Sequence, residues 1–355
     1  MSLSSSRSNL SPTDLHRDQE LEPQSQGKSR VGIVTPCYNG EAFVRDTIVS
    51  VDAQTFTDWK HVVVNDGSTD HTADVLNAYV GKDLRRQIVH QENQGQAATN
   101  NRVAALMKEE VDYLLFLDAD DTLKPHALEV AVEYLDQHPD VGAVHWRFEV
   151  VDEKGAVLPE HFKNQWHRRH VPSRLGVKVL PDKAAETPLR AVITHCGMIP
   201  SCMLIRPSVF ESTAGFNTSA EFASGLKDVD LFIQLALQAP IHRVPAVGSQ
   251  YRVHDDQVTA DIQKMDQQYE KLLRRWRGMA FRTPYGGARL QRALLFAECR
   301  KPTADRLYAA ACEWRNGAYG TAARVWTGAV ARYLWSLLPS RIAAPLYLKM
   351  RALAA

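Results

Sequence analysis

The strongest constraint on the fold is an apolar run that ends in a cluster of acids. Residues 113–117, Tyr-Leu-Leu-Phe-Leu, are apolar without a break, and Asp118, Asp120 and Asp121 follow them. A run without alternation predicts a strand covered on both faces, as in a parallel sheet. The acids then lie just past the carboxyl end of that strand, where open α/β sheets bind their ligands.

The acid cluster predicts a metal site. Carboxylates this close repel one another unless a cation or a proton relieves them. Mg²⁺ or Mn²⁺ takes oxygen ligands and commonly shares them with phosphate. A single acid here would be a helix cap or a solvated loop residue, but three acids after a buried strand favour a metal. We expect Asp120 and Asp121 to be direct ligands, with Asp118 on a ribose or a bound water.

Strand and helix patterns alternate before and after this run. Short strands are expected at residues 31–36, 61–65, 87–90 and 113–117, each followed by a helical segment. This alternation predicts an α/β, doubly wound sheet in which the loops after the strands share one edge.

Polar residues end the other expected strands at the same edge. They are Thr35, Tyr38 and Glu41 after the first strand, Asp66 after the second, and Asn93 and Gly95 after the third. Polar groups that converge from several strand ends predict a nucleotide site. Asp66 can accept the ring N–H of uracil or thymine, and Tyr38 offers a face for stacking.

Four segments together resemble the motifs of the family 2 glycosyltransferases. They are Val-Thr-Pro-Cys-Tyr-Asn-Gly at 34–40, Val-Val-Asn-Asp-Gly-Ser-Thr-Asp at 63–70, Asn-Gln-Gly at 93–95 and Phe-Leu-Asp-Ala-Asp-Asp at 116–121. The match is strong over residues 31–125 and weaker to about residue 258. The resemblance implies the GT-A fold, with a Rossmann-like, mostly parallel sheet. It also implies a nucleotide-diphosphate sugar donor, a divalent metal on the Asp-x-Asp motif and inversion at the anomeric carbon.

The resemblance assigns a role to each matching residue. The residues that would bind the nucleotide sugar are Thr35, Pro36, Tyr38, Glu41, Asp66, Asn93, Gly95, Asp118 and Ala119. Asp118 would face the ribose, and Asp120 the metal-bridged diphosphate. The family usually carries Arg-Asn where this chain has Asn100-Asn101. Either a cationic donor contact is missing, or Arg102 supplies it from another angle.

Residues 226–232, Leu-Lys-Asp-Val-Asp-Leu-Phe, resemble the Glu-Asp motif that opens a helix near the acceptor. An inverting transfer needs a base for the proton of the acceptor hydroxyl, and Asp228 is the expected base. Asp228 could instead be a helix-start carboxylate favoured by the helix dipole, and Asp230 is the fallback base. Lys227 replaces the family's Glu; it would hold an acidic acceptor or point to solvent.

Residues 251–254, Tyr-Arg-Val-His, resemble the Tyr-Arg-x-His sequence that often closes the family's domain. His254 would then approach the metal or the diphosphate, and Arg252 would support it. A lone histidine is more often packed or solvated, so both interpretations stay open. The expected metal site for Mn²⁺ or Mg²⁺ is Asp120, Asp121 and His254.

Composition narrows the class of protein. The 42 Lys and Arg balance 41 Asp and Glu, so no general affinity for nucleic acid is expected. The five cysteines are scattered and odd in number, which fits a reducing compartment. No apolar run approaches the roughly 20 residues needed to span a bilayer, and the N-terminus lacks a signal-peptide core. We therefore expect a cytoplasmic protein.

The chain divides into three expected parts. Residues 1–29 read as a disordered tail, residues 30–258 as the GT-A glycosyltransferase domain and residues 259–355 as a helical C-terminal extension. Within the domain, residues 160–195 lack periodicity and suggest a functional loop or lid. The basic C-terminal helices would pack on the domain or make peripheral contact with the inner face of the membrane. Binding to anionic liposomes at low salt tests the second interpretation.

We expect a metal-dependent, inverting glycosyltransferase that moves a sugar from a UDP- or dTDP-sugar to a saccharide or lipid-linked acceptor, in cell-surface polysaccharide or glycan assembly. One alternative is a catalytically silent nucleotide- or carbohydrate-binding module, since Asn100 and Lys227 depart from the family pattern. A sugar nucleotidyltransferase would need a Gly-rich, basic phosphate loop, which residues 35–38 lack. Processive synthesis is disfavoured because Arg275-Trp276 lacks the glutamine of the Gln-x-x-Arg-Trp motif.

Overall fold

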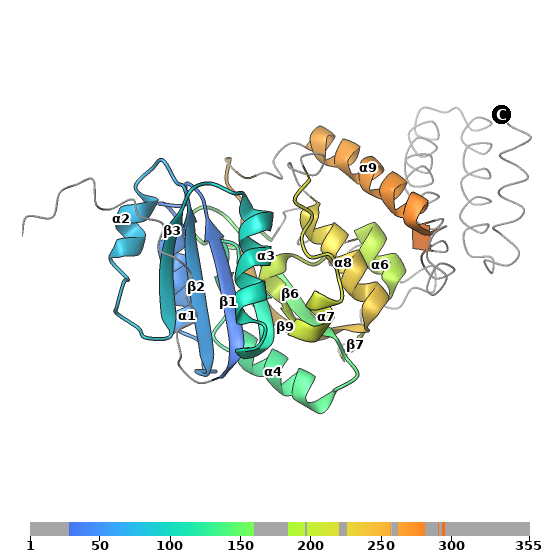
Figure 1. Ribbon diagram of the computed structural model, residues 1–355, viewed down its shortest axis with the longest axis horizontal. Coiled ribbons are helices and arrows are strands. Elements are labelled where there is room, and N and C mark those ends of the chain that lie inside the picture. The colour runs from blue at the N-terminus through green and yellow to red at the C-terminus, as the bar shows by residue number, and fades with distance from the viewer. Residues whose placement is uncertain are drawn as a thin grey trace, which may run out of the picture.

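The computed structural model describes residues 28–159, 184–195, 197–219, 226–255, 257, 262–280, 290 and 293–294. Within them, nine strands form one mixed sheet in the order β3-β2-β1-β4-β8-β6-β9-β5, with β7 paired to β9 (Figure 1). The expected tail, most of the expected lid and most of the C-terminal extension lie outside the described residues. The expected α/β architecture is confirmed.

The four strands predicted from apolar runs form one parallel half of the sheet. They are β1 (Ser29–Cys37), β2 (Trp59–Asp66), β3 (Arg86–Gln91) and β4 (Val111–Phe116). The helices between them are α1 (Val44–Asp52), α2 (Thr72–Asn77) and α3 (Gln96–Met107). In Figure 1, α3 lies across the near face of β1. Because β4 is covered on both sides, Leu114, Leu115 and Phe116 are almost completely buried.

The second half of the sheet mixes parallel and antiparallel pairs. Its strands are β5 (Thr122–Leu123), β6 (Ala143–Val151), β7 (Ala185–Glu186), β8 (Met203–Ile205) and β9 (Ile241–Arg252). Its helices are α4 (Ala127–Gln137), α6 (Leu189–His195), α7 (Pro207–Glu211) and α8 (Lys227–Gln238), with a 3₁₀ turn η3 at Pro200–Cys202. The prediction of irregular structure up to residue 195 is therefore wrong for α6, a short helix whose Leu189, Val192 and Ile193 are buried.

Strand β9 carries C-terminal residues to the edge where the acids lie. Its register runs parallel to β6 as far as the pair Val151 and Arg252. Near that end, Gln250 pairs with Thr122 of the short strand β5, directly after the acid cluster. The Thr122 hydroxyl also donates to Gln250 Oε1 at 3.0 Å. This pairing brings the end of β9 against the acid loop.

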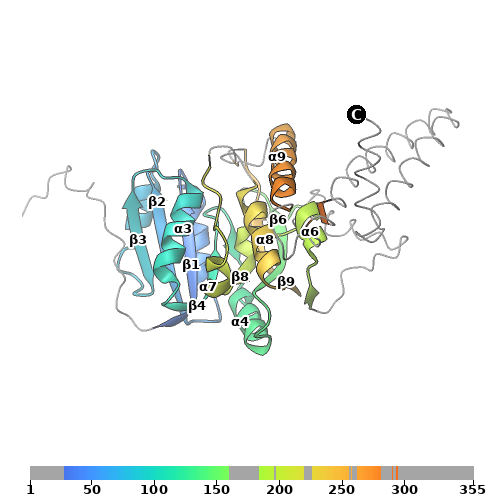
Figure 2. The same ribbon diagram turned by 45° about the vertical axis from the view of Figure 1, so that its right-hand side comes forward.

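Helix α9 (Ile262–Ala280) packs on α8 and α6, as Figures 1 and 2 both show. Trp276 Nε1 donates to Asp230 Oδ1 on α8 at 2.9 Å, and the Tyr269 hydroxyl donates to Ile193 O on α6 at 2.8 Å. Leu272 and Leu273 are buried in the same core as the sheet. This part of the extension thus packs on the domain.

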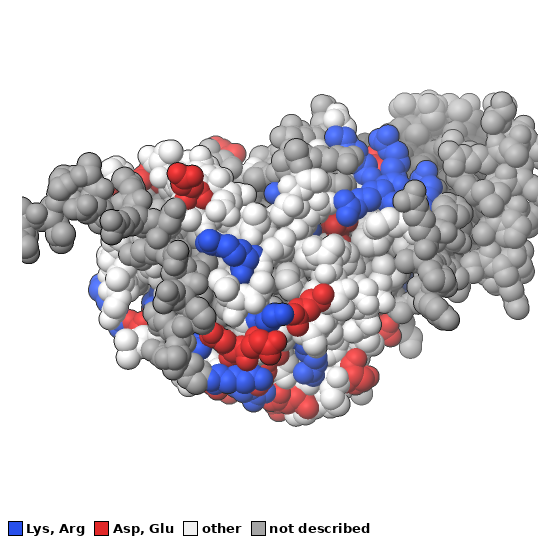
Figure 3. Space-filling view, viewed as in Figure 1, with Lys and Arg blue, Asp and Glu red and all other residues white. Residues whose placement is uncertain are grey.

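The outward side of α9 is basic. Arg274 and Arg275 are exposed there, and Arg275 also reaches Asp230 of α8 at 3.8 Å. Figure 3 shows Lys and Arg side chains gathered over this helix. In the part of the chain that the structure describes, no helix is both long enough and apolar enough to cross a membrane. Contact between the extension and a membrane surface stays a prediction.

Candidate functional site

The acid loop after β4 is held by hydrogen bonds from residues distant in the sequence. The Thr47 hydroxyl lies 2.8 Å from the carbonyl oxygens of both Ala119 and Asp121. On the other side, the Asp118 backbone N–H donates to Ser201 Oγ at 3.1 Å. Gln96 Nε2 donates to Asp118 Oδ1 at 2.7 Å. Three segments, from α1, α3 and the 3₁₀ turn η3, therefore hold the acid loop in place.

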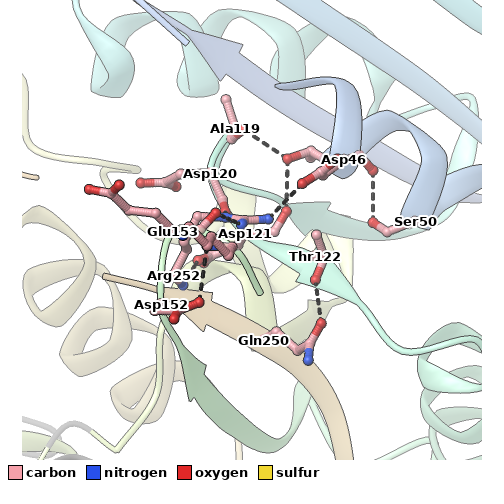
Figure 4. Close-up of polar contacts among 12 residues, drawn as sticks. Asp46, Ser50, Ala119, Asp120, Asp121, Thr122, Asp152, Glu153, Gln250 and Arg252 are labelled. Atoms are coloured by element: carbon pink, nitrogen blue, oxygen red, sulfur yellow. Dashed lines mark hydrogen bonds and ion pairs between the residues drawn. The ribbon is translucent and has the colours of Figure 1, made fainter. Parts of the chain in front are cut away.

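Arg252 joins three parts of the protein behind the acid loop (Figure 4). Its Nε donates to Asp120 O at 3.0 Å and its Nη1 to Glu153 O at 2.6 Å. Its Nη2 pairs with Asp46 Oδ2 at 3.0 Å, and its backbone N–H donates to Asp121 Oδ1 at 3.1 Å. Arg252 is 4% exposed. Arg252 therefore holds the acid loop, while the support of His254 that the resemblance implied stays a prediction.

Replacing Arg252 with methionine is expected to destabilise the fold. The variant keeps the length of the side chain but leaves the carbonyl groups of Asp120 and Glu153 without their donors. Buried carbonyls left unpaired cost free energy, and we expect the free energy of unfolding to fall by about 3 kcal/mol. Asp46→Asn is the control, because its partly exposed ion pair contributes at most about 1 kcal/mol. Urea unfolding measures both, and equal midpoints for the two variants would contradict the prediction.

The acids and His254 form a donor set suited to a divalent metal. His254 Nε2 lies 3.1 Å from Asp120 Oδ2. Burial and the nearby carboxylates of Asp121, Asp120 and Asp228 raise the pKa of Asp118 well above its ordinary value. A bound cation would relieve this repulsion. The residues therefore fit Mg²⁺ or Mn²⁺ in their chemistry.

The three expected ligands do not form a ready-made metal centre. Among the described residues, no three His, Cys, Asp or Glu side chains are grouped closely enough to hold a metal ion by themselves. Asp121 is 1% exposed, and its Oδ1 accepts the backbone N–H of Arg252. Asp120 and His254 are better placed, and phosphate oxygens would have to complete the shell. The metal site stays a prediction.

The loop after β1 presents one open aromatic face. The Tyr38 side chain is 54% exposed, which leaves its ring free to stack. Thr35 is completely buried, and its hydroxyl lies 2.9 Å from His61 Nε2. Pro36 is also buried. A ligand would thus meet Thr35 and Pro36 through the backbone.

Glu41 ties the loop after β1 to the loop after β2. Its Oε2 accepts the backbone N–H of His71 at 2.6 Å, and its own N–H donates to Asp70 Oδ2 at 3.2 Å. These bonds show a positioning contact, while the expected contact between Glu41 and a nucleoside stays a prediction.

Asp66 ends β2 and binds the loop that opens α3. Its Oδ1 accepts from Gln91 Nε2 at 2.6 Å and from the Gln94 backbone N–H at 2.9 Å. Its Oδ2 accepts from the Gly95 backbone N–H at 2.8 Å. Gly95 has φ +85°, a conformation that favours glycine. Asp66 is 2% exposed, so a nucleobase could contact only a small part of its carboxylate.

The loops that carry Asp66 and Asn93 touch closely. Gly67 has φ +72°, and a Cβ placed there would meet the backbone nitrogen of Asn93 at 2.7 Å. Only glycine permits this approach. The side chain of Asn93 is exposed at the same edge.

Asn100, which stands where the family usually has Arg, has a buried side-chain oxygen with no hydrogen-bond partner among the described residues, whereas its neighbours Asn101 and Arg102 are bonded. Asn100 is 1% exposed, and the Asn101 side chain bonds both the N–H and the carbonyl of Phe216 at 2.8 Å. Arg102 donates through Nη2 to Gln91 Oε1. The contact described for Arg102 is therefore with Gln91, next to Asp66.

Helix α8 carries Asp228 towards the acid loop. The charge of Asp228 contributes to the raised pKa of Asp118. Together with burial and Asp121, it also raises the pKa of the Cys202 thiol to about 12. Leu226, just before the helix, has φ +59°, a strained conformation for leucine. Asp228 and the acid cluster thus lie close enough to interact.

Asp230 and Lys227, the charged residues next to Asp228 on α8, are assigned different roles by their surroundings. Asp230 is completely buried and accepts from Trp276 of α9 and from Gln234 of its own helix. Burial raises its pKa. These contacts leave Asp230 poorly placed as the fallback base. Lys227 is half-buried, and burial lowers the pKa of its amine.

Three contacts at this edge were missing from the sequence analysis. They are made by Gln91 on Asp66, Gln96 on Asp118 and Ser201 on the Asp118 backbone. Gln96 directly follows the 93–95 motif, so its position after an expected strand end was a usable signal. Ser201 carries no such signal, because its segment reaches the edge only through the antiparallel strand β8.

Comparisons with known proteins show which family the chain resembles. A model of glycosyl transferase family 2 matches residues 32–212. The putative teichuronic acid biosynthesis glycosyltransferase TuaG of Bacillus subtilis is 38% identical over 109 residues, which are 30% of this chain and 42% of TuaG. In the first four curated relatives, the match spans from 12% to 42% of the relative's own length.

Two solved structures share the fold. S. aureus TarS 1–349 in complex with UDP-GlcNAc aligns with a TM-score of 0.56 and 17% identity, over 87% of this chain and 82% of that one. The mannosyltransferase PcManGT from Pyrobaculum calidifontis, in complex with GDP-Man and Mn²⁺, aligns with a TM-score of 0.55 and 20% identity, over 96% of this chain and 84% of that one.

Proposed function

The chain belongs to glycosyl transferase family 2, and on this premise we propose that it transfers a sugar from a nucleotide-diphosphate donor with inversion at the anomeric carbon. The observation that carries the proposal is the geometry of the acid loop after β4, where His254 lies 3.1 Å from Asp120 and Gln96 bonds Asp118, with the charge of Asp228 on α8 adding to the raised pKa of Asp118. It supports one site that has a donor side and a base on the acceptor side.

Asp66 and Tyr38 would bind the nucleoside. A carboxylate accepts the ring N–H of uracil, thymine or guanine, while the exposed Tyr38 ring stacks on the base. UDP- and dTDP-sugars remain the favoured donors. Support for a nucleotide-sugar donor also comes from the fold shared with TarS and PcManGT, which were solved with UDP-GlcNAc and GDP-Man.

Asp120 and His254 would hold a divalent metal together with the diphosphate. When bound, Mn²⁺ or Mg²⁺ would supply positive charge against the departing diphosphate. Asp118 would face the ribose, where Gln96 positions its Oδ1. Arg252 and Thr47 hold the backbone of this loop from behind, so that the acids keep their places during the reaction.

Asp228 would act as the general base. As the acceptor oxygen forms its bond to the anomeric carbon, the bond from that carbon to the diphosphate oxygen breaks, and the hydroxyl proton passes to Asp228. Attack from the face opposite the leaving group inverts the configuration. The half-buried Lys227 beside it would hold an acidic group of the acceptor.

We place this reaction in cell-surface polysaccharide or glycan assembly, with a saccharide or a lipid-linked sugar as acceptor. TuaG, which is named for teichuronic acid biosynthesis, supports this setting. A catalytically silent binding module is the second candidate, because Asn100 and Lys227 replace the family's usual Arg and Glu.

Donor hydrolysis separates the two candidates. A panel of UDP-, dTDP-, GDP- and CDP-sugars is incubated with the protein, with and without Mn²⁺, and the released nucleoside diphosphate is measured. We expect Mn²⁺-dependent release from at least one donor. Binding of a donor without any release, also after addition of saccharide acceptors, would favour the silent module.

A further inference from the structure

We propose that Gln91, held in one orientation by Arg102, determines which nucleobase Asp66 accepts. Gln91 ends β3 and pairs with Asp66 in the register of the sheet. Its Nε2 lies 2.6 Å from Asp66 Oδ1. The inference rests on the proposed function, because it concerns the base of the donor that the same site would bind.

The orientation of the Gln91 amide follows from its neighbours. A guanidinium only donates hydrogen bonds, so Arg102 Nη2 must face Gln91 Oε1. The amide nitrogen then points to Asp66 and to Thr99 Oγ1, which lies 2.9 Å away. A reversed amide would set its oxygen against the Asp66 carboxylate and its N–H groups against Arg102. Arg102 therefore ensures that Gln91 presents a donor to Asp66.

The donors around Asp66 leave its carboxylate able to accept only one further hydrogen bond. A carboxylate oxygen has two lone-pair directions. Within the described residues, Oδ1 accepts from Gln91 and Gln94, which fills both of its directions. Oδ2 accepts from Gly95 and retains one direction. Through Oδ2, the carboxylate of Asp66 can therefore accept one further N–H.

The free lone pair of Asp66 Oδ2 favours those nucleobases that carry a ring N–H. Uracil and thymine offer N3–H, and guanine offers N1–H, so each can donate to Asp66. Cytosine presents an unprotonated N3, whose lone pair would face the carboxylate oxygen. Because neither cytosine N3 nor the Asp66 carboxylate has a proton to donate, no hydrogen bond forms between them and the binding of cytosine is strongly weakened. We therefore expect UDP to bind at least about 100-fold more tightly than CDP.

Calorimetric titration with UDP and CDP in the presence of Mn²⁺ tests the role of Gln91. In Gln91→Glu, the new carboxylate still accepts from Arg102 but cannot donate to Asp66. Two carboxylates at this distance repel each other, so the Asp66 side chain is expected to turn away from position 91 and to lose its alignment with the N–H of the base. The preference for UDP over CDP is expected to fall by at least about tenfold. Arg102→Met removes the donor that Gln91 Oε1 accepts and so loosens the Gln91 side chain beside Asp66; it is expected to shift the preference in the same direction.

Gln94→Ala is the matched control. Its side chain is exposed and only its backbone N–H contacts Asp66, so the preference should stay as in the unmodified protein. An unchanged preference in both Gln91→Glu and Arg102→Met, with unfolding midpoints near the native one, would overturn the inference.

Asp66→Asn separates this inference from the proposed function. If Asp66→Asn binds UDP as tightly as the unmodified protein, the base site itself is wrongly assigned and the inference falls with it. If Asp66→Asn loses UDP while the Gln91 and Arg102 variants keep the preference, the base site stands and only the role of Gln91 is refuted.

Discussion

Replacing Asp120 with asparagine is expected to lower kcat/KM for sugar transfer by at least about 1000-fold. Asparagine preserves the shape of the side chain and can still bond His254, but it removes the negative charge that a divalent metal requires. The loss should appear as weaker binding of Mn²⁺ in the presence of UDP, measured by titration calorimetry, as well as in turnover. The backbone carbonyl of Asp120 keeps its bond to Arg252, so the unfolding midpoint should change little.

Asp112→Asn is the matched control for this experiment. Asp112 lies near the start of the same strand, β4, where it pairs with Lys28 and Arg30. These ion pairs are partly exposed and contribute little to stability. The control should retain full activity and Mn²⁺ binding. Native turnover in Asp120→Asn would remove Asp120 from the metal site.

Asp228→Asn is expected to lower kcat by about 1000-fold while leaving donor binding nearly intact. The amide cannot take the proton from the acceptor hydroxyl. Because the donor contacts are assigned to residues after β1, β2, β3 and β4, the Kd for UDP should stay within about threefold of the native value. A pH profile of the residual activity should also lose its acidic limb, since the group that must be deprotonated is gone.

Asp230→Asn distinguishes catalysis from a structural effect on α8. Asp230 is buried between α8 and α9, and an asparagine there keeps an oxygen for Trp276. We expect kcat to stay within about tenfold of native, with the main change in the unfolding midpoint. If Asp230→Asn loses as much turnover as Asp228→Asn, or if Asp228→Asn transfers normally, the assignment of the base is wrong.

The parallel half of the sheet was predictable because its signals are local. A buried parallel strand must be apolar throughout. The apolar runs that end at Asp66 and before Asp118 therefore predicted both the strands and the sheet edge at which they end. Parallel strands place their carboxyl ends together. For this reason the residues of several loops could be assigned to one site before the structure was known.

The supports of that site were less predictable because they depend on long-range pairing. Ser201 reaches Asp118 only because β8 runs antiparallel between β4 and β6. The contacts of Arg252 with Glu153 and Asp46 depend on how far β9 extends beside β6. Likewise, the burial of Thr35 against His61 is a property of neighbouring strands rather than of the β1 motif. Register of this kind is set by the packed core, which the pattern within one segment does not reveal.

The hydrogen bond between Trp276 and Asp230 determines the rotation of α8 about its own axis. An apolar contact between two helices tolerates small rotations, whereas an indole N–H that must meet a buried carboxylate tolerates few. Asp228 lies on the same helix, so the angle at which it faces the acid loop depends on a tryptophan of α9, and both helices lie beyond the segment matched to the family. Relatives that replace α9 with a different segment would have to set this angle by another contact, and could thereby present the same aspartate to acceptors of a different shape.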